Sequence, residues 1–244
     1  MFRVLIRPRM IALTLACALG IVVMLNRARW QYHRHQERQD FNATLTARFD
    51  EAPRPLEELL ASGSPLEDLE WLPAIATGTY LPEESVSVVN VSQFGQAGFD
   101  PVTPLRLADS RIVLINRGFL PLSAATPSPP AGEVSVVGRI RMSTVRRTGA
   151  VTDPSEGDLK EVQRIDIDRL APQLNGDVVP VYLEQLTGEP PDDPSISRIA
   201  EPEFTLGPHL SYTVQWTVFS MFVLVGWVFV VRREVRRSST SAQK

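Results

Sequence analysis

Two long apolar runs stand out from an otherwise polar chain, one near each end. The first, Met10 to Leu25, carries no charge and follows three arginines. At 1.5 Å per residue a helix of this length reaches about 24 Å, short of a hydrocarbon core of about 30 Å. We therefore expect the helix to continue to Trp30, with its last arginines extended towards the headgroups. The second run, Leu210 to Val231, has no formal charge and is long enough to cross with some tilt.

The first run also resembles a cleaved signal peptide, because a short basic region followed by an apolar stretch is typical of one. No small-x-small cleavage site follows Leu25, since the sequence turns to Asn26-Arg27-Ala28-Arg29. A lipoprotein site at Cys17 is disfavoured because the apolar run continues past it. We predict that the segment is retained as an anchor.

Between the two runs the pattern changes from helical spacing to short β-branched segments. Residues 30–50 are polar, with apolar residues at roughly helical spacing, and predict an extension of the first helix that ends before Pro53. The predicted strands are Leu72–Tyr80, Ser85–Val91, Arg111–Asn116, Glu133–Met142 and Val178–Gln185, and the predicted short helices are Leu56–Ala61 and Ile165–Leu174. The fold class that follows is a membrane protein: two transmembrane helices flank a β-rich α+β extracytoplasmic domain, built as a compact sheet or a partly open barrel.

Charge is segregated along the chain and indicates the topology. Residues 32–208 hold 27 acidic and 15 basic residues, a net of −12, whereas the flanks are basic. The acidic middle argues against nucleic acid as a partner, and the basic ends suit an anionic cytoplasmic leaflet of the lipid bilayer. Arginines between 27 and 38 oppose this orientation, so the positive-inside rule favours it over the inverse orientation only weakly.

The resulting prediction places both termini in the cytoplasm of a bacterial plasma membrane and the central domain in the periplasm or outside the cell. The nine residues before the first run are too few for a mitochondrial presequence. The predicted regions are a cytoplasmic N-terminus (1–9), a first transmembrane helix (10–30), an extracytoplasmic β-rich domain (31–208), a second transmembrane helix (209–231) and a cytoplasmic basic tail (232–244).

The central domain offers no strong catalytic or metal-binding pattern. A single cysteine excludes a disulfide framework, and there is no Gly-x-Ser-x-Gly, phosphate loop or dinucleotide fingerprint. His33 and His35 lie two apart, which on a helix directs them to different faces, so we interpret them as solvated juxtamembrane side chains. The pairs Glu57-Glu58 and Asp192-Asp193 lie in polar stretches, and we interpret them as solvated carboxylates.

His209 is a stronger candidate, because it stands at the outer mouth of the second run. Tyr212 and Trp216 follow at +3 and +7, so on a helix the three share one face. One interpretation is an aromatic belt with a histidine at the headgroup level. The other is a ligand or proton group, and a neutral imidazole there could coordinate haem iron axially.

Four ordered motifs resemble the Surfeit locus protein family. They are Trp30-Gln31 followed by Arg34, the stretch from Gly98 to Pro121 that contains Asn116-Arg117-Gly118, the strand Val137 to Arg141, and His209-Leu210-Ser211-Tyr212 with Gln215-Trp216. The chain departs from the family pattern at four positions. Pro208 replaces an Asn, Thr213 an Ala and Phe119 a Trp, and Arg29 stands where a small or apolar residue is usual.

The resemblance implies an assembly factor for haem-copper cytochrome c oxidase, a non-enzymatic protein that acts while haem a enters subunit I. Subunit I and haem a synthase are the partners it implies, and His209 becomes the candidate haem contact, with Tyr212, Trp216 and Trp30 beside it. The absence of cysteine pairs suits a haem-related task rather than copper delivery.

For the motif Asn116-Arg117-Gly118 the resemblance implies a strand-to-turn element. Gly118 would supply an unusual backbone angle, and Arg117 an ion pair or a partner contact. A purely structural role, as a turn that shapes the domain, stays open beside a direct role.

Two other function classes remain open. A stable accessory subunit of the respiratory complex would share the same anchors. A membrane-anchored periplasmic hydrolase would need a nucleophile and a base, and the only histidines of the outside domain are His33 and His35. Histidine-based catalysis is therefore disfavoured, whereas a carboxylate mechanism is not excluded.

Overall fold

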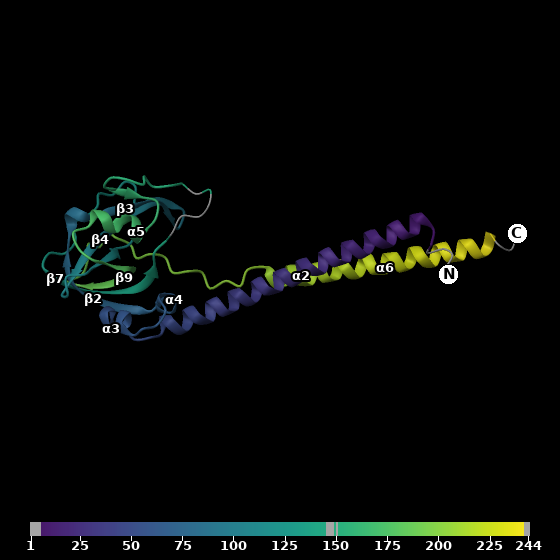
Figure 1. The fold of residues 1–244 in the computed structure, drawn as a ribbon, viewed down its shortest axis with the longest axis horizontal. Helices are drawn as coiled ribbons and strands as arrows, with labels where there is room; N and C mark the ends of the chain where they lie inside the picture. The colour runs from purple at the N-terminus through teal and green to yellow at the C-terminus, as the bar shows by residue number, and fades with distance from the viewer. Residues whose placement is uncertain (1–5, 145–148, 150, 242–244) are drawn as a thin grey trace. The chain divides into compact units, whose positions relative to one another are not determined.

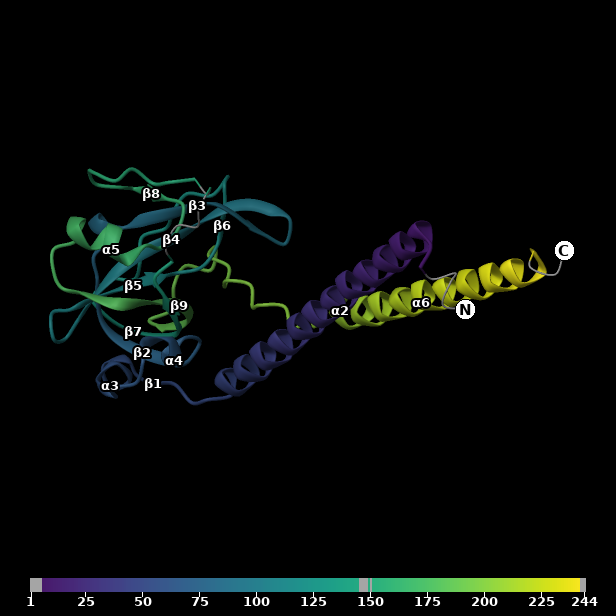
Figure 2. The same cartoon turned by 45° about the vertical axis from the view of Figure 1, so that its right-hand side comes forward.

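The structure, a computed structural model, describes residues 6–144, 149 and 151–241. The chain divides into two compact units. Unit 1 combines Met1–Thr44 with Glu203–Lys244, and unit 2 comprises Leu45–Pro202. Figures 1 and 2 show the elements of each unit, which are described separately below.

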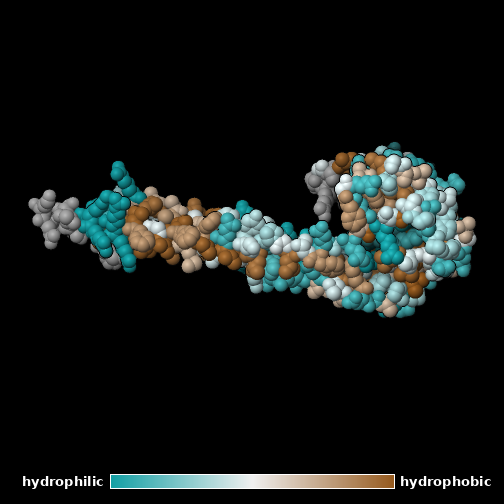
Figure 3. Space-filling model, turned by 180° about the vertical axis from the view of Figure 1, so that it is seen from behind, coloured by the Kyte–Doolittle hydropathy of each residue, from teal (hydrophilic) through white to brown (hydrophobic). Residues whose placement is uncertain are grey.

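Unit 1 contains two long helices, α2 (Pro8–Phe49, whose last turns belong to unit 2) and α6 (His209–Ser241). Both are long and apolar enough to cross a membrane. Their large apolar side chains point outward over most of the apolar segments, which Figure 3 shows as a brown band. A soluble protein rarely leaves such a surface uncovered, so this band suits a lipid environment.

The two helices pack antiparallel along a narrow seam (Figures 1 and 2). Inward positions of α2 recur three or four residues apart, and they include Met10, Thr14, Cys17, Ile21, Met24, Ala28 and Gln31. Across the seam, Trp227 Nε1 donates to Thr14 Oγ1 at 3.0 Å, and Thr213 Oγ1 lies 3.5 Å from the Ala28 carbonyl oxygen. Ala28 is only 6% exposed, so a small residue allows the helices to approach closely at this level.

Unit 2 is built on a mixed sheet that has nine strands in the described residues. The strands are β1 (Arg54–Pro55), β2 (Pro73–Tyr80), β3 (Val86–Gln93), β4 (Gln96–Leu107), β5 (Ile112–Asn116), β6 (Leu120–Pro121), β7 (Glu133–Met142), β8 (Glu161–Val162) and β9 (Val178–Glu189). The prediction of a β-rich domain between two apolar helices is thereby confirmed.

Five of these strands pair in a circuit that returns to its start. From β2 the pairing runs through β7, β9, β5 and β4, and β4 then pairs with the far end of β2 at Gly78–Tyr80. A Cβ at Gly78 would lie 2.1 Å from the carbonyl oxygen of Arg106 on β4. Glycine is therefore required where the two strands close the circuit.

The interior of the circuit is the main apolar core. Alternate residues of the five strands point inward, and two short helices, α3 (Leu56–Ala61) and α4 (Leu66–Leu69), add leucines to the same cluster. A second cluster lies between β3, β4 and β5 and the short helix α5 (Ile167–Leu170) with the 3-10 turn η2 (Ala171–Gln173). The two cores hold the sheet from both faces.

Most elements follow the sequence pattern, and the differences have local causes. β7 and α3 have the predicted bounds, whereas the predicted helix at Ile165–Leu174 is two shorter pieces, α5 and η2. The sequence did not predict β4, because Pro101 and Pro104 interrupt its pattern. Both proline carbonyls still accept hydrogen bonds, from Arg117 N and Leu81 N. The two prolines have no N–H to donate, but β4 still pairs with a strand on each side.

Candidate functional site

His209 is the first residue of α6, at the end of unit 1 where the chain enters the helix. The carbonyl oxygen of Pro208 accepts the first helical hydrogen bond, from Tyr212 N at 3.1 Å. Pro208 lies before the first turn, so its missing N–H costs the helix nothing. Thr213 Oγ1 donates to the His209 carbonyl oxygen at 3.0 Å and fixes the first turn further. The proline that departs from the family motif is therefore compatible with a regular helix start.

The imidazole of His209 contacts α2 through one hydrogen bond. Its Nδ1 lies 2.8 Å from Oε1 of Gln31, in a partly buried position on the seam. Ala28, one turn earlier on α2, faces Thr213, one turn later on α6, so the contact continues the register of the seam. Both residues belong to the family motifs, but their contact was not predicted from the sequence.

Gly207 lies close to the other edge of the imidazole. Its φ is +62°, and a Cβ built on it would lie 3.3 Å from both Nε2 and Cδ2 of His209. Gly207 N donates to Thr205 Oγ1 at 3.1 Å, which holds the turn before the helix. Within the described part of the chain His209 Nε2 has no hydrogen-bond partner. This nitrogen is the atom that remains for a ligand.

The aromatic residues predicted beside His209 differ in exposure. Tyr212 and Trp30 are 45% and 49% exposed, whereas Trp216 is half-buried on the seam and packs edge-to-face on Phe219 at 6.2 Å. The guanidinium of Arg34 lies 5.9 Å from the Trp30 ring centroid. The rings of Trp30, next to Gln31, and of Tyr212, one turn after His209, are therefore both exposed.

His35 corrects the interpretation of the juxtamembrane histidines. His33 is exposed and accepts a hydrogen bond from Arg29 Nε at 3.3 Å, as a solvated side chain would. His35 is only 8% exposed, and its Nδ1 is buried without a hydrogen-bond partner in the described residues. The prediction missed this because His35 lies one turn beyond Gln31 on the same face of α2.

The motif Asn116-Arg117-Gly118 follows the end of β5 in unit 2. Asn116 Nδ2 donates to Asp100 Oδ2 at 3.1 Å, and Asn116 Oδ1 accepts from Gly118 N at 3.2 Å. The other carboxylate oxygen of Asp100 is buried without a partner among the described residues. Burial of this carboxyl raises its pKa to about 6, although the hydrogen bond from Asn116 acts in the opposite direction.

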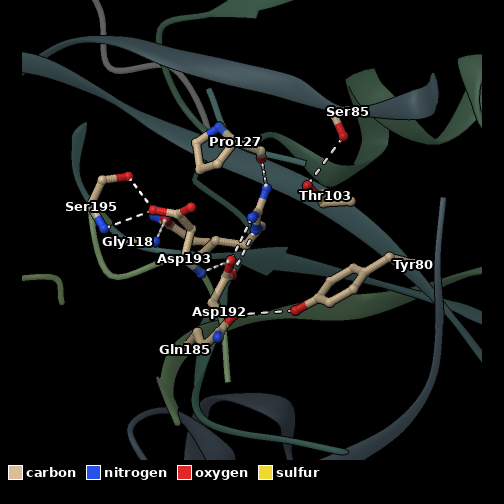
Figure 4. A network of polar contacts seen from close by, with 11 residues as sticks. Tyr80, Ser85, Thr103, Gly118, Pro127, Gln185, Asp192, Asp193 and Ser195 are labelled. Carbon is tan, nitrogen blue, oxygen red and sulfur yellow. Dashed lines mark hydrogen bonds and ion pairs between the residues drawn. The ribbon is translucent and has the colours of Figure 1, made fainter. Parts of the chain in front are cut away.

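Arg117 forms a buried ion pair with Asp192, whose side chain is labelled in the polar network of Figure 4. Its Nε and Nη2 donate to the two carboxylate oxygens at 2.8 and 2.6 Å, and Nη1 donates to the Pro127 carbonyl oxygen at 3.0 Å. The side chains are 1% and 10% exposed. The interpretation of Asp192 as a solvated carboxylate is therefore wrong. Both of its carboxylate oxygens accept hydrogen bonds from Arg117, which is 75 residues away in the chain and so cannot be recognised from the local sequence. Asp193 and the Glu57-Glu58 pair are exposed as expected.

Gly118 allows a second segment to pass close to the motif. Its φ is +134°, and a Cβ there would lie 2.3 Å from the carbonyl oxygen of Ser197. Phe119 N donates to that oxygen at 2.7 Å, and Ser197 N donates to the Phe119 carbonyl at 3.0 Å. Together with the ion pair at Asp192, these bonds fasten residues 192–197, which lead towards α6, to the sheet.

A cavity lies next to this ion pair, and Asp193 in its lining forms a local turn with Ser195. The cavity holds about 290 Å³ beside Arg117, Gln185 and Asp192. Ser195 Oγ donates to Asp193 at 2.6 Å, but Ser195 N donates to the same oxygen at 2.9 Å, as in a local turn. These hydrogen bonds lower the pKa of Asp193, so its carboxylate is a weak base.

The described residues contain no cluster of three or more metal-ligating side chains. His209 is a candidate ligand side chain, because its Nδ1 contacts Gln31 and its Nε2 has no hydrogen-bond partner in the described residues. The residues that sequence reasoning missed are Gly207, as the neighbour of His209, and Asp192, as the partner of Arg117. A Gly-Pro pair directly before the histidine was the available signal for the first; none was available for the second.

Comparison with known proteins agrees with the motifs. The model of the SURF1 family matches residues 18–221. A "SURF1-like protein" of Monosiga brevicollis is 28% identical over 91% of this chain and 88% of its own length. An "uncharacterized SURF1-like protein" of Mycobacterium bovis is 26% identical over 95% of this chain and 87% of its own length. The match covers the whole sheet-rich unit, most of α2 and the first part of α6, and the chain belongs to the SURF1 family.

Proposed function

We propose that this protein is an assembly factor for a haem-copper cytochrome c oxidase, which holds haem a while the haem enters subunit I. The SURF1 family is generally linked to oxidase assembly and is a family of assembly factors rather than of catalysts.

The observation that carries the proposal is the state of the His209 imidazole. Nδ1 is held by Gln31 at 2.8 Å, whereas Nε2 has no hydrogen-bond partner in the described residues and lies beside a glycine. A haem-ligating histidine has this arrangement, in which one nitrogen binds the metal and the other is oriented by a hydrogen bond. The exposed rings of Trp30 and Tyr212 offer apolar surface for a macrocycle.

In this proposal the chain binds and orients the haem and performs no reaction. His209 would hold the haem through Nε2, and the haem would supply an iron that accepts a nitrogen ligand. Trp30 and Tyr212 would contact the ring system. The two apolar helices would cross a bacterial plasma membrane with both termini in the cytoplasm, and haem a synthase and subunit I would be the partners that deliver and receive the haem.

The experiment that tests this function compares the full-length protein with its His209→Ala variant in cells that synthesise haem a. We expect the purified wild-type protein to carry a haem a spectrum and the variant to lose it. His33→Ala is the matched control, because His33 lies near the same end of the helix pair but is exposed. The proposal fails if neither wild type nor control carries haem, and oxidase activity survives deletion of the gene.

Co-purification separates this role from that of a permanent accessory subunit. An assembly factor should be found with incomplete subunit I and be absent from the mature oxidase. Stoichiometric amounts in the mature complex would instead identify a stable subunit. Tagged protein and tagged oxidase, purified from the same membranes, give both measurements.

A further inference from the structure

The imidazole of His209 is held by a residue whose position depends on the packing of the whole helix pair. The contacts of Thr14 with Trp227 and of Ala28 with Thr213 set the register of α2 against α6. Gln31 lies three residues after Ala28, and His209 four residues before Thr213, so continuation of the register brings the two together. The contact between Gln31 and His209 is therefore a consequence of backbone packing and not of a single flexible side chain.

The hydrogen bond to Gln31 has a direct effect on the chemistry of His209. A neutral imidazole carries one N–H, and the nitrogen that faces an acceptor carries it. Oε1 of Gln31 is an acceptor and lies 2.8 Å from Nδ1. Nδ1 therefore donates, and the lone pair remains on Nε2, which is the nitrogen beside Gly207.

We infer that Gln31 is a positioning residue for haem ligation: its side-chain oxygen holds His209 in the Nδ1–H tautomer, and Gly207 places no Cβ beside Nε2. This inference rests on the proposed function, in which Nε2 of His209 binds a haem iron. Outer-sphere partners of metal-bound histidines fix ring orientation and raise ligand basicity, and their loss typically lowers metal affinity 10- to 100-fold. Gln31 has the geometry of such a partner.

The inference distinguishes two substitutions of Gln31 by their chemistry. Gln31→Leu keeps the approximate size but removes the acceptor, so both tautomers become accessible. Gln31→Glu keeps an acceptor at the same reach, and its negative charge makes the imidazole more basic. Gln36→Leu is the matched control, because Gln36 lies on an exposed face of the same helix.

The experiment uses the full-length protein in lipid nanodiscs and has two readouts. The first is imidazole ¹⁵N NMR without haem, which reports the tautomer; the chain has three histidines, and His209→Ala assigns the signal of interest. The second is titration with haem a, which gives the dissociation constant and the reduction potential of the bound haem. The NMR readout does not depend on haem binding, so it tests Gln31 separately.

We expect the wild-type His209 to be protonated at Nδ1, and Gln31→Leu to lose this preference and to bind haem about 10- to 100-fold more weakly. Gln31→Glu should retain the tautomer, bind within a few-fold of wild type, and lower the reduction potential of the haem. A wild-type His209 protonated at Nε2 overturns the inference, as does unchanged tautomer and affinity in Gln31→Leu. Should His209→Ala bind haem normally, the proposed function fails, while the NMR result still decides the role of Gln31 in setting the tautomer.

Discussion

Arg117 and Asp192 are joined by two short hydrogen bonds inside unit 2, although 75 residues separate them in the chain. The arginine belongs to the turn after β5, and the aspartate to the segment that leaves β9 towards α6. Because Phe119 and Ser197 pair beside this ion pair, the motif Asn116-Arg117-Gly118 fastens the outgoing segment to the sheet. These contacts give the motif a specific structural role, and its contribution to stability can be measured.

The first prediction concerns the loss of one partner of this ion pair. Asp192→Ala would leave the guanidinium of Arg117, whose side chain is 1% exposed, buried without its counter-charge. We expect a loss of about 3–5 kcal/mol in the free energy of unfolding, the usual cost of such an unpaired charge. Urea unfolding of the full chain in detergent, followed by tryptophan fluorescence, measures it. Asp193→Ala at the exposed neighbouring residue is the control, and equal stability of the two variants would contradict the assignment.

The second prediction separates backbone strain from steric conflict at Gly118. Gly118→Ala places a Cβ 2.3 Å from the Ser197 carbonyl oxygen at a φ of +134°. Gly95→Ala meets a positive φ of +78° with no atom within 4 Å of the new Cβ. We expect the control to lose about 1–2 kcal/mol from the backbone alone. Gly118→Ala should lose more and should also expose residues 192–197 to proteolysis; equal losses would exclude the close approach as the reason for this glycine.

The third prediction uses the raised pKa of Asp100, which burial brings to about 6 from an ordinary value of 3.8. The folded state holds the proton more tightly than the unfolded state, so stability is full below about pH 4 and falls as the pH rises through 6. The loss amounts to about 3 kcal/mol at pH 7. Asp100→Asn should remove this dependence. The difference in thermal unfolding temperature between the variant and wild type should therefore be more favourable to the variant at pH 7 than at pH 4. Asp158→Asn, at an exposed position, should leave the pH profile unchanged.

The sequence predicted elements that depend on local pattern and missed contacts that depend on packing. The alternation in Glu133–Met142 was sufficient to give β7 its bounds, because each residue of that strand faces either core or solvent. Asp192 looked like one of a pair of solvated carboxylates, since nothing near it in the chain reveals Arg117. The contact of Gln31 with His209 likewise requires the register of two helices, which no local spacing determines.

The fourth prediction tests that register directly. Thr213 Oγ1 lies 3.5 Å from the Ala28 carbonyl oxygen, so we expect cysteines at these two positions to come within reach of a disulfide. In a Cys17→Ser background, Ala28→Cys with Thr213→Cys should cross-link within one chain under mild oxidation, as a mobility shift in non-reducing gels. Asn26→Cys with Thr213→Cys is the control, because Asn26 is exposed on another face of α2. Cross-linking of the control pair, with none at Ala28, would contradict the seam.

The last prediction concerns the space beside the nitrogen proposed to bind haem. Gly207→Ala adds a Cβ 3.3 Å from His209 Nε2, at a φ of +62° that alanine adopts only with strain. The new methyl group should cover the ligand nitrogen or displace the ring from its hydrogen bond with Gln31. Loss of such an outer-sphere contact lowers metal affinity about tenfold or more, so we expect haem a to bind at least that much more weakly. Gly226→Ala is the matched control, since Gly226 lies in α6 and a Cβ there meets nothing within 4 Å. The measurement is haem a titration of the two full-length variants. If both bind like wild type, Nε2 of His209 is not the nitrogen that meets the iron.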